Sequence, residues 1–270
     1  MSYKILALDL DGTLTDSAKS ILPRTRAAVI EAQRRGVRVL LVSGRPANGI
    51  YRLAEELELE KYGGYIMAFN GVQVIECSTG RTVAQSYVEP ELFRYICRCA
   101  KERGLQICTY RNDLIYTEMP EDKYLIEEKT VNRMTLHKVD DLVAAVDFPV
   151  PKCLVTGDPS VLAPLETEMR AAIGDRMGVF RSEPYFLEFV PDGLNKAKAL
   201  EMMLGRLGVG REELMACGDG FNDIQMIEYA GLGVAMGNAC EPVRAVADYV
   251  TKSNDEDGVA FVVEKFLLNR

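Results

Sequence analysis

The chain has 270 residues, of which 48% are hydrophobic and 27% charged, a composition typical of a globular protein with one large domain or two modest ones. Its formal net charge of −8 disfavours nucleic acid and anionic membrane surfaces as partners, because both are themselves negatively charged. No apolar run reaches the length of a membrane span and no signal peptide precedes Asp9, so we expect a cytoplasmic protein.

Cysteine and histidine chemistry is disfavoured. The seven cysteines form no Cys-x-x-Cys pair, which indicates reduced thiols rather than a zinc site or a disulfide framework. His137 is the only histidine, and no nucleophile motif surrounds it, so we interpret it as a surface or half-buried residue. A P-loop is excluded because no Gly-Lys pair exists, and a nucleophile elbow at Ser43 is excluded because position 41 is leucine.

Strands and helices alternate over the first eighty residues. An apolar run that ends at a turn signal predicts a buried strand, and a strand–helix–strand order predicts a parallel pair with a right-handed crossover. The predicted elements are a strand ending at Asp9, a helix from Pro23 to about Gly36, a strand over 37–42, a helix over 49–59, a strand over 65–69 and a hairpin arm over 72–75.

From about residue 82 the pattern changes to short strands joined by hairpins, with helices between them. This order is typical of an α+β unit with a largely antiparallel sheet, and none of the motifs discussed below falls in it. Residues 130–148 show no clear pattern. The predicted elements are strands over 83–88, 105–110, 114–116, 152–156, 177–181 and 185–190, and helices over 89–103, 121–129 and 159–173.

The parallel pattern resumes near residue 190. The predicted elements are helices over 195–207, 223–229, 241–247 and 258–268, and strands over 214–217, 232–235 and 248–250. We therefore predict an α/β fold with two domains. Residues 1–82 and 190–270 form a discontinuous parallel-sheet core, and residues 83–189 form an inserted α+β domain.

Polar residues follow three of the predicted core strands. Asp9 and Asp11 lie two residues apart, so their side chains point to the same side. An ordinary Asp-Gly turn accounts for Asp11, but Asp9 lies inside the apolar run and needs a partner. Ser43 follows the next strand, and Gly218-Asp219-Gly220-Phe221-Asn222-Asp223 follows a later one. Because parallel strands share a carboxyl edge, we expect these residues to meet there.

Four carboxylates and one lysine are thus expected at this edge: Asp9, Asp11, Asp219, Asp223 and Lys196. Two unit charges about 4 Å apart repel by roughly 4 kcal/mol at an effective dielectric constant of 20, so the acids need a cation or a shared proton. Carboxylate and carbonyl oxygens are hard ligands that select Mg²⁺. With Asp11 protonated, a dication and Lys196 would balance the three remaining acids.

This inventory suits phosphoryl transfer through an aspartyl-phosphate. Asp9 would be the nucleophile, and Asp11 would protonate the leaving oxygen and then deprotonate the attacking water. Ser43, backbone N–H groups and Lys196 would stabilise the charge on the phosphoryl oxygens.

The four motifs resemble those of the haloacid dehalogenase superfamily, in the family's order. The first is Asp9-Leu10-Asp11-Gly12-Thr13, the second Ser43-Gly44-Arg45, the third Lys196 and the fourth Gly218-Asp219-Gly220-Phe221-Asn222-Asp223. The size and place of the insertion are similar to the large α/β (C2-type) cap of the Cof-type branch. So are Asn70-Gly71 and the segment from Ser253 to Val259.

The resemblance implies a Rossmann-like core with a cap domain and a magnesium-dependent phosphatase of small phosphate monoesters, such as sugar phosphates or related metabolites. It implies that Asp9, the backbone carbonyl of Asp11 and Asp219 bind Mg²⁺. Asp223 would be a ligand or its support. By the same resemblance Ser43, Gly44, Arg45, Lys196 and Asn222 would bind substrate. Two positions depart from the family's usual residues, Ala197 for glycine and Gly220 for asparagine.

Three other functions fit some of the same residues. A phosphomutase of similar build would return the phosphoryl group to the sugar. A receiver-like signalling domain also has a phosphoaccepting Asp, Mg²⁺, a hydroxyl and a lysine, but an acid–base group at Asp11 would shorten the life of its phosphoaspartate. A non-catalytic ligand-binding relative is the third. The sequence favours no particular metabolite and no particular oligomeric state.

Overall fold

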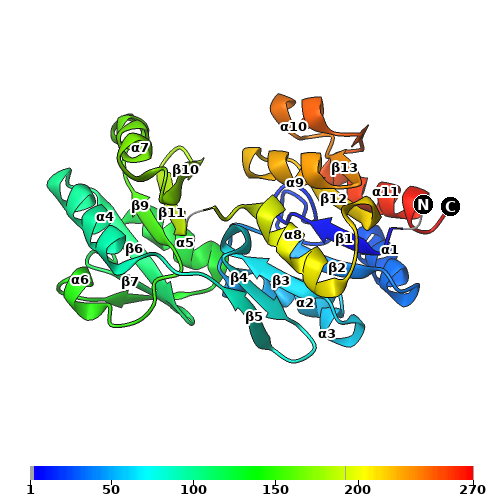
Figure 1. Cartoon of the computed structure of the whole chain (residues 1–270), viewed down its shortest axis with the longest axis horizontal. Helices are drawn as coiled ribbons and strands as arrows, with labels where there is room; N and C mark the ends of the chain where they lie inside the picture. Colours follow the sequence, from blue (N-terminus) through cyan, green and yellow to red (C-terminus); the bar gives the residue numbers. More distant parts are fainter. Residues whose placement is uncertain (1–2, 192, 270) are drawn as a thin grey trace. The chain divides into compact units, whose positions relative to one another are not determined.

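The computed structural model describes residues 3–191 and 193–269, and its contacts divide the chain into two units (Figure 1). The first unit consists of Met1–Gly44, Ile50–Val83 and Asn195–Arg270. The second consists of Arg45–Gly49 and Ala84–Leu194. The segment Arg45–Gly49 thus groups with the second unit, whereas the sequence placed all of residues 1–82 in the core.

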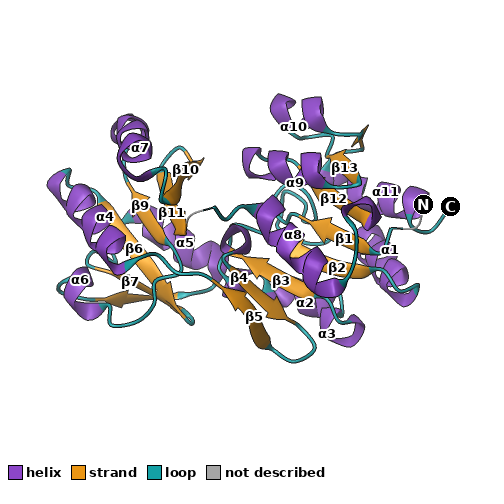
Figure 2. Cartoon of the chain, viewed as in Figure 1, coloured by secondary structure: helices purple, strands orange, loops and turns teal. Residues whose placement is uncertain are grey.

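An eight-stranded sheet forms the centre of the first unit (Figures 1 and 2). Neighbouring strands from β14 to β3 are parallel, and β4 returns antiparallel to β3. The α/β fold predicted from the sequence is therefore confirmed. The order is β14 (Tyr249–Val250), β13 (Leu232–Ala235), β12 (Leu214–Gly218), β1 (Ile5–Leu8), β2 (Arg38–Val42), β3 (Tyr65–Ala68), β4 (Gln73–Glu76) and β5 (Arg81–Gln85).

The helices of this unit begin and end close to the predicted bounds, with one exception. The helix predicted over 49–59 is confirmed only over Tyr51–Glu56, because Glu58 adopts a left-handed conformation (φ 56°) that separates it from a second short helix. The helices are α1 (Pro23–Arg34), α2 (Tyr51–Glu56), α3 (Leu59–Tyr62), α8 (Lys196–Leu207), α9 (Ile224–Tyr229), α10 (Glu241–Val246) and α11 (Gly258–Phe266).

The second unit has its own six-stranded sheet. The strand pairs are antiparallel except for β7 and β8, which are parallel. The order is β10 (Met177–Glu183), β11 (Phe186–Pro191), β9 (Cys153–Thr156), β6 (Gln106–Arg111), β7 (Leu114–Thr117) and β8 (Thr135–Lys138). Its helices are α4 (Pro90–Glu102), α5 (Lys123–Asn132), α6 (Leu142–Ala145) and α7 (Pro159–Ile173).

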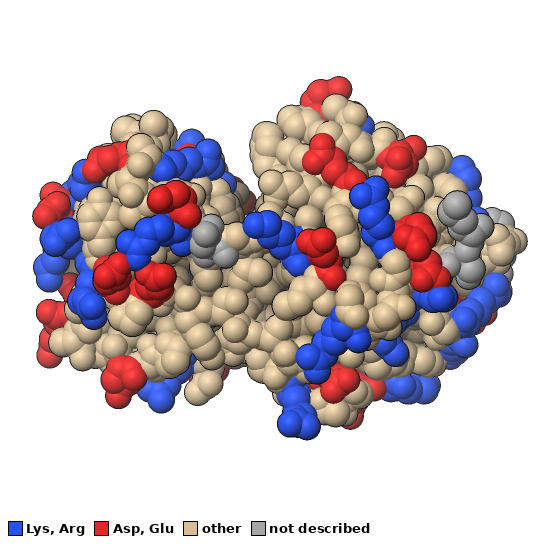
Figure 3. All heavy atoms as spheres, viewed as in Figure 1, with Lys and Arg blue, Asp and Glu red and all other residues tan. Residues whose placement is uncertain are grey.

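Each unit buries an apolar core of its own. In the first unit all four residues of β1 are buried between its neighbours β12 and β2. In the second unit Leu92 and Ile96 of α4 pack with Leu162 and Met169 of α7 in one apolar cluster. On the face drawn in Figure 3, acidic and basic side chains are interspersed. Within the described residues no helix is both long enough and apolar enough to cross a bilayer.

Candidate active site

Strand register brings three polar segments to one edge of the first sheet. Leu8 of β1 pairs with Cys217 of β12 on one side and with Leu41 of β2 on the other. Asp9 directly follows β1, while Ser43 directly follows β2 and Asp219 directly follows β12. Parallel strands in register end together, so residues more than two hundred positions apart in the chain meet at this edge.

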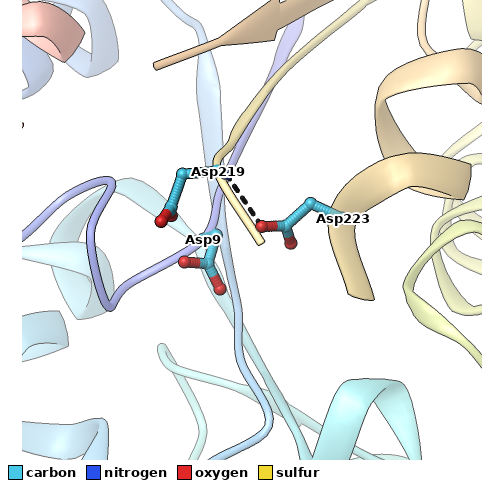
Figure 4. Close-up of side chains that lie close together, drawn as sticks. All are labelled: Asp9, Asp219 and Asp223. Atoms are coloured by element: carbon cyan, nitrogen blue, oxygen red, sulfur yellow. Dashed lines mark hydrogen bonds between the residues drawn. The ribbon is translucent and has the colours of Figure 1, made fainter. Parts of the chain in front are cut away.

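Asp9, Asp219 and Asp223 converge at this edge (Figure 4). Each offers one carboxylate oxygen, and these oxygens all lie within 4.8 Å of one another. Asp9 and Asp223 are buried, and Asp219 is half-buried. The structure thus brings together three of the four carboxylates that were expected at this edge.

Lys196 is the cation of the cluster. Its side chain is fully buried, and Nζ donates to Asp9 Oδ1 (2.5 Å) and to Asp223 Oδ1 (2.6 Å). Lys196 is the first residue of α8, and Asn195 caps that helix by accepting from the Lys198 N–H (2.9 Å). The capped helix start therefore fixes the point from which the lysine reaches the acids.

Asp223 orders the loop that carries Asp219. Its Oδ2 accepts from the backbone N–H groups of Asp219 and Gly220, both at 2.9 Å. A Cβ atom at position 218 would lie 2.6 Å from the Asp223 Cβ, so only glycine allows this approach. Both Asp223 oxygens are thus engaged, one by Lys196 and the other by the loop.

Thr13 fixes Asp219 from the opposite end of the chain. Its hydroxyl donates to Asp219 Oδ1 at 2.7 Å. Between Thr13 and Asp11 stands Gly12, whose φ of +80° is in the left-handed region, and a side chain there would also overlap the Asp219 carboxylate. The Asp-Gly-Thr order of the first motif therefore has a geometric reason.

The charges in this cluster are not balanced by the protein alone. Burial, together with Asp223, raises the pKa of Asp9 well above its usual range despite the ammonium of Lys196. Burial raises the pKa of Asp219 to about 6, although the Thr13 hydrogen bond opposes the change. Burial alone would lower the pKa of Lys196, but Asp223 and Asp9 outweigh it and raise that pKa. The cluster therefore favours an additional positive charge.

The donor set fits a small hard cation. Lys196 and Thr13 donate to the Oδ1 atoms of Asp9 and Asp219, and within the described residues no hydrogen bond reaches either Oδ2. Oxygens around Mg²⁺ at about 2.1 Å lie roughly 3 to 4 Å apart, close to the spread of this cluster. Asp9 and Asp219 would therefore hold the ion. Asp223, with both oxygens engaged, suits the supporting role better than that of a ligand.

Asp11 lies outside the three-carboxylate cluster. Its carboxylate accepts from Lys19 Nζ at 2.6 Å, and its side chain is 38% exposed. The metal contact expected of Asp11 is made by its backbone carbonyl, so it does not depend on where the side chain lies. Lys19 was not identified from the sequence. It stands in a polar loop, in a left-handed conformation, without any motif around it.

The expected phosphate-binding residues do not all group together. Ser43 is buried, and its carbonyl accepts from the Asn70 N–H (2.8 Å). Asn222 donates from Nδ2 to the Asn70 side chain (3.1 Å), so Asn70 links the second and fourth motifs. Gly44 stands beside the same Asn70 amide. Arg45 instead belongs to the second unit, where it donates to the Gly49 carbonyl at 3.2 Å.

Thr13 and Asn70 were quoted within sequence motifs but were given no role in the site, and Asn238 was not identified. All three follow a strand of the parallel sheet, so the rule that identified Asp9 and Asp219 applies to them as well. No comparable signal marks Lys19.

The site lies at the carboxyl edge of a parallel sheet, where a buried lysine stands between carboxylates. This arrangement defines a class of hydrolase whose acidic residues can bind a metal ion. The chain belongs to the haloacid dehalogenase-like hydrolase family, whose pattern it matches over residues 6–263. The resemblance seen in the four motifs is confirmed, including its Cof-type branch, and the chain is an enzyme of the phosphatase kind.

Individual relatives agree with this assignment. The chain is similar to the putative phosphatase YxeH of Bacillus subtilis (strain 168), with 30% identity over 98% of this chain and 99% of YxeH. It is also similar to a haloacid dehalogenase-like hydrolase from Bacteroides thetaiotaomicron, with 44% identity over 98% and 99% of the two chains and a TM-score of 0.93. The HAD subclass IIB sugar phosphatase BT4131 gives 25% identity over 97% and 98%, with a TM-score of 0.83.

Proposed function

We propose that this chain is a magnesium-dependent phosphatase that hydrolyses small phosphate monoesters, sugar phosphates or related metabolites, through an aspartyl-phosphate at Asp9. The observation that supports it most is the cluster of Asp9, Asp219 and Asp223 around the buried ammonium of Lys196. Its one lysine cannot neutralise three acids, whereas Lys196 and a bound dication together would balance them.

Asp9 and Asp219 would hold Mg²⁺, with the carbonyl of Asp11 as the further expected ligand. The ion would supply Lewis acidity and keep the Asp9 carboxylate ionised at neutral pH. Lys196 holds Oδ1 of Asp9 at 2.5 Å and so orients the carboxylate that would act as nucleophile. Ser43 and Asn222, together with Lys196, would stabilise the negative charge of the phosphoryl oxygens.

The reaction follows in two steps. A carboxylate oxygen of Asp9 attacks phosphorus, the ester P–O bond breaks, and Asp11 gives its proton to the leaving oxygen. Water then attacks phosphorus, Asp11 takes the water proton, and the bond between the Asp9 oxygen and phosphorus breaks to release phosphate. Since the Asp11 carboxylate now contacts Lys19, that contact must give way when substrate binds.

The two domains and the substrate class are part of the proposal. Residues 83–189 would form the cap that selects among phosphate esters. The similarity to the sugar phosphatase BT4131 supports sugar phosphates as the first class to test.

Release of inorganic phosphate tests the proposal directly. We expect Mg²⁺-dependent release from at least one member of a panel of sugar phosphates, flavin mononucleotide and pyridoxal phosphate. The Asp9→Asn variant should be inactive while its circular dichroism spectrum is unchanged. Release that survives EDTA or the Asp9→Asn change would contradict it. Appearance of an isomeric sugar phosphate in place of free phosphate would identify a phosphomutase.

A further inference from the structure

The turn from Met236 to Cys240 contacts both loops that carry the acidic cluster. The N–H of Met236 donates to the Gly218 carbonyl (3.0 Å), and that of Cys240 donates to the Asp219 carbonyl (3.1 Å). From the same turn the Asn238 side chain donates to the Gly12 carbonyl at 2.8 Å. One short turn thus connects the loop after β12 with the loop after β1.

A second asparagine continues this connection. Asn238 Oδ1 accepts from the backbone N–H of Asn254 (3.0 Å), and Asn254 Nδ2 donates to the Thr15 carbonyl (2.9 Å). The carbonyls of Gly12 and Thr15 lie on either side of Thr13 in the chain. Two connected side-chain amides therefore hold the backbone that positions the Thr13 hydroxyl.

Stability alone gives a poor reason for the contact that Asn238 makes. Asn238 is exposed, as is its hydrogen bond to Gly12. Exposed hydrogen bonds contribute little to folding, because water replaces a lost partner. Geometry gives a better reason. Thr13 donates to Asp219 at 2.7 Å, and Asp11 precedes it by only two residues, so a small shift of this loop would displace both groups.

We propose that Asn238 and Asn254 are positioning residues of the phosphatase reaction. They hold the Gly12–Thr15 loop at a fixed distance from the Asp219 loop, and through it they place Asp11 and Thr13. This inference rests on the proposed function for its catalytic consequence, but the loop contacts themselves do not depend on it.

Asn238→Ala and Asn254→Ala test the proposal, with Asp255→Ala as the matched control. Asp255 lies in the same exposed turn and accepts two hydrogen bonds from Ser17 (2.8 and 2.7 Å), farther along the loop from Thr13. At saturating Mg²⁺ and substrate we expect kcat to fall about 10-fold or more in both asparagine variants, with KM changed less than about 2-fold, and kcat of the control to stay within about 2-fold of wild type.

Hydrogen exchange gives a readout that needs no activity. The amides of Leu14 and Thr15 should exchange faster in both asparagine variants than in the wild type or in Asp255→Ala. Asn238→Asp keeps the size of the side chain but lacks the donor to Gly12, so it should behave as Asn238→Ala does. This conservative variant separates a lost contact from a failure to fold.

The proposal requires both results. Wild-type kcat in the asparagine variants, unchanged exchange at Leu14 and Thr15, or an equal loss in Asp255→Ala would each overturn it. If the wild type releases no phosphate from any ester tested, the proposed function fails instead, and the exchange comparison still decides whether the two asparagines hold the loop.

Discussion

Lys196 Nζ lies 2.5 Å from Asp9 Oδ1, fully buried in a site where acids outnumber bases. The same ammonium reaches Asp223 at 2.6 Å, and Asp219 completes the cluster. A lysine placed between two carboxylates keeps the nucleophile close and oriented before substrate arrives. One lysine does not neutralise three carboxylates, and the remaining negative charge is the physical reason for expecting a divalent ion.

Replacing Lys196 by methionine should abolish turnover and destabilise the fold. Removing one partner from a buried ion pair leaves uncompensated charge and typically costs about 3–5 kcal/mol. Urea unfolding of Lys196→Met measures this loss. Lys198→Met is the control, because Lys198 stands two residues along the same helix and is exposed. Equal stability of the two variants would show that the buried lysine is not needed for charge balance.

Mg²⁺ should raise the melting temperature of the wild type in the absence of substrate. A ligand that binds only the folded state stabilises it by about 2.7 kcal/mol at 100 times its Kd. Asp219→Asn should lose most of this stabilisation, because it removes a proposed ligand charge. Asp175→Asn, an exposed acid in the second unit, should retain all of it. A Mg²⁺ response that is the same in all three proteins would place the ion elsewhere.

Stability of the metal-free protein should fall as the pH rises through 6. The pKa of Asp219 is raised from its ordinary value of 3.8 to about 6 in the folded state, so the folded state binds its proton more tightly than the unfolded chain does. The associated stability is fully present below about pH 4 and is lost as the pH passes 6. Chemical unfolding at pH 4 to 7.5 measures this.

The stabilisation that Mg²⁺ provides should depend on pH in the opposite direction and increase as the pH rises. Mg²⁺ binding needs the ionised carboxylate, so stabilisation by Mg²⁺ should be larger at pH 7.5 than at pH 5. Asp219→Asn should flatten both profiles. If metal-free wild type and metal-free Asp219→Asn show the same dependence of stability on pH, Asp219 is ionised throughout this range.

Thr13→Val should weaken Mg²⁺ binding while leaving the fold intact. Valine has nearly the shape of threonine but cannot donate to Asp219 Oδ1, a hydrogen bond to a charged group that is worth about 1.5–3 kcal/mol. We expect calorimetry to show a Kd for Mg²⁺ that is about tenfold higher. Thr13→Ser retains the hydroxyl and should bind as the wild type does; if serine also fails, the methyl group rather than the hydroxyl matters.

Most of the acidic site was predictable because it depends on strand ends. Asp9 and Asp219 directly follow β1 and β12, and parallel strands in register must bring such residues together. Lys196 was predictable only as one charge among many. Its burial depends on the packing of α8, which no local pattern in the sequence reveals.

The sequence-based prediction failed where local signals were weak. The strand Thr135–Lys138 is mostly exposed, lies at a sheet edge and lacks an apolar pattern, so residues 130–148 gave no prediction. The helix break at Glu58 depends on a left-handed conformation that glutamate rarely adopts. Asn238 and Asn254 stand sixteen residues apart, and only the tertiary fold places their amides on one loop.

Phosphorylation of Asp9 is the central claim, and Asp11→Asn makes it directly measurable. An aryl phosphate with a good leaving group needs no proton from Asp11, whereas the attacking water does need its base. The variant with Mg²⁺ should therefore release one burst of phenolate and then stop, and peptide mass spectrometry after acid quenching should find the phosphoryl group on Asp9. Steady turnover without a phosphorylated peptide, or a phosphoryl group on any other residue, would contradict it.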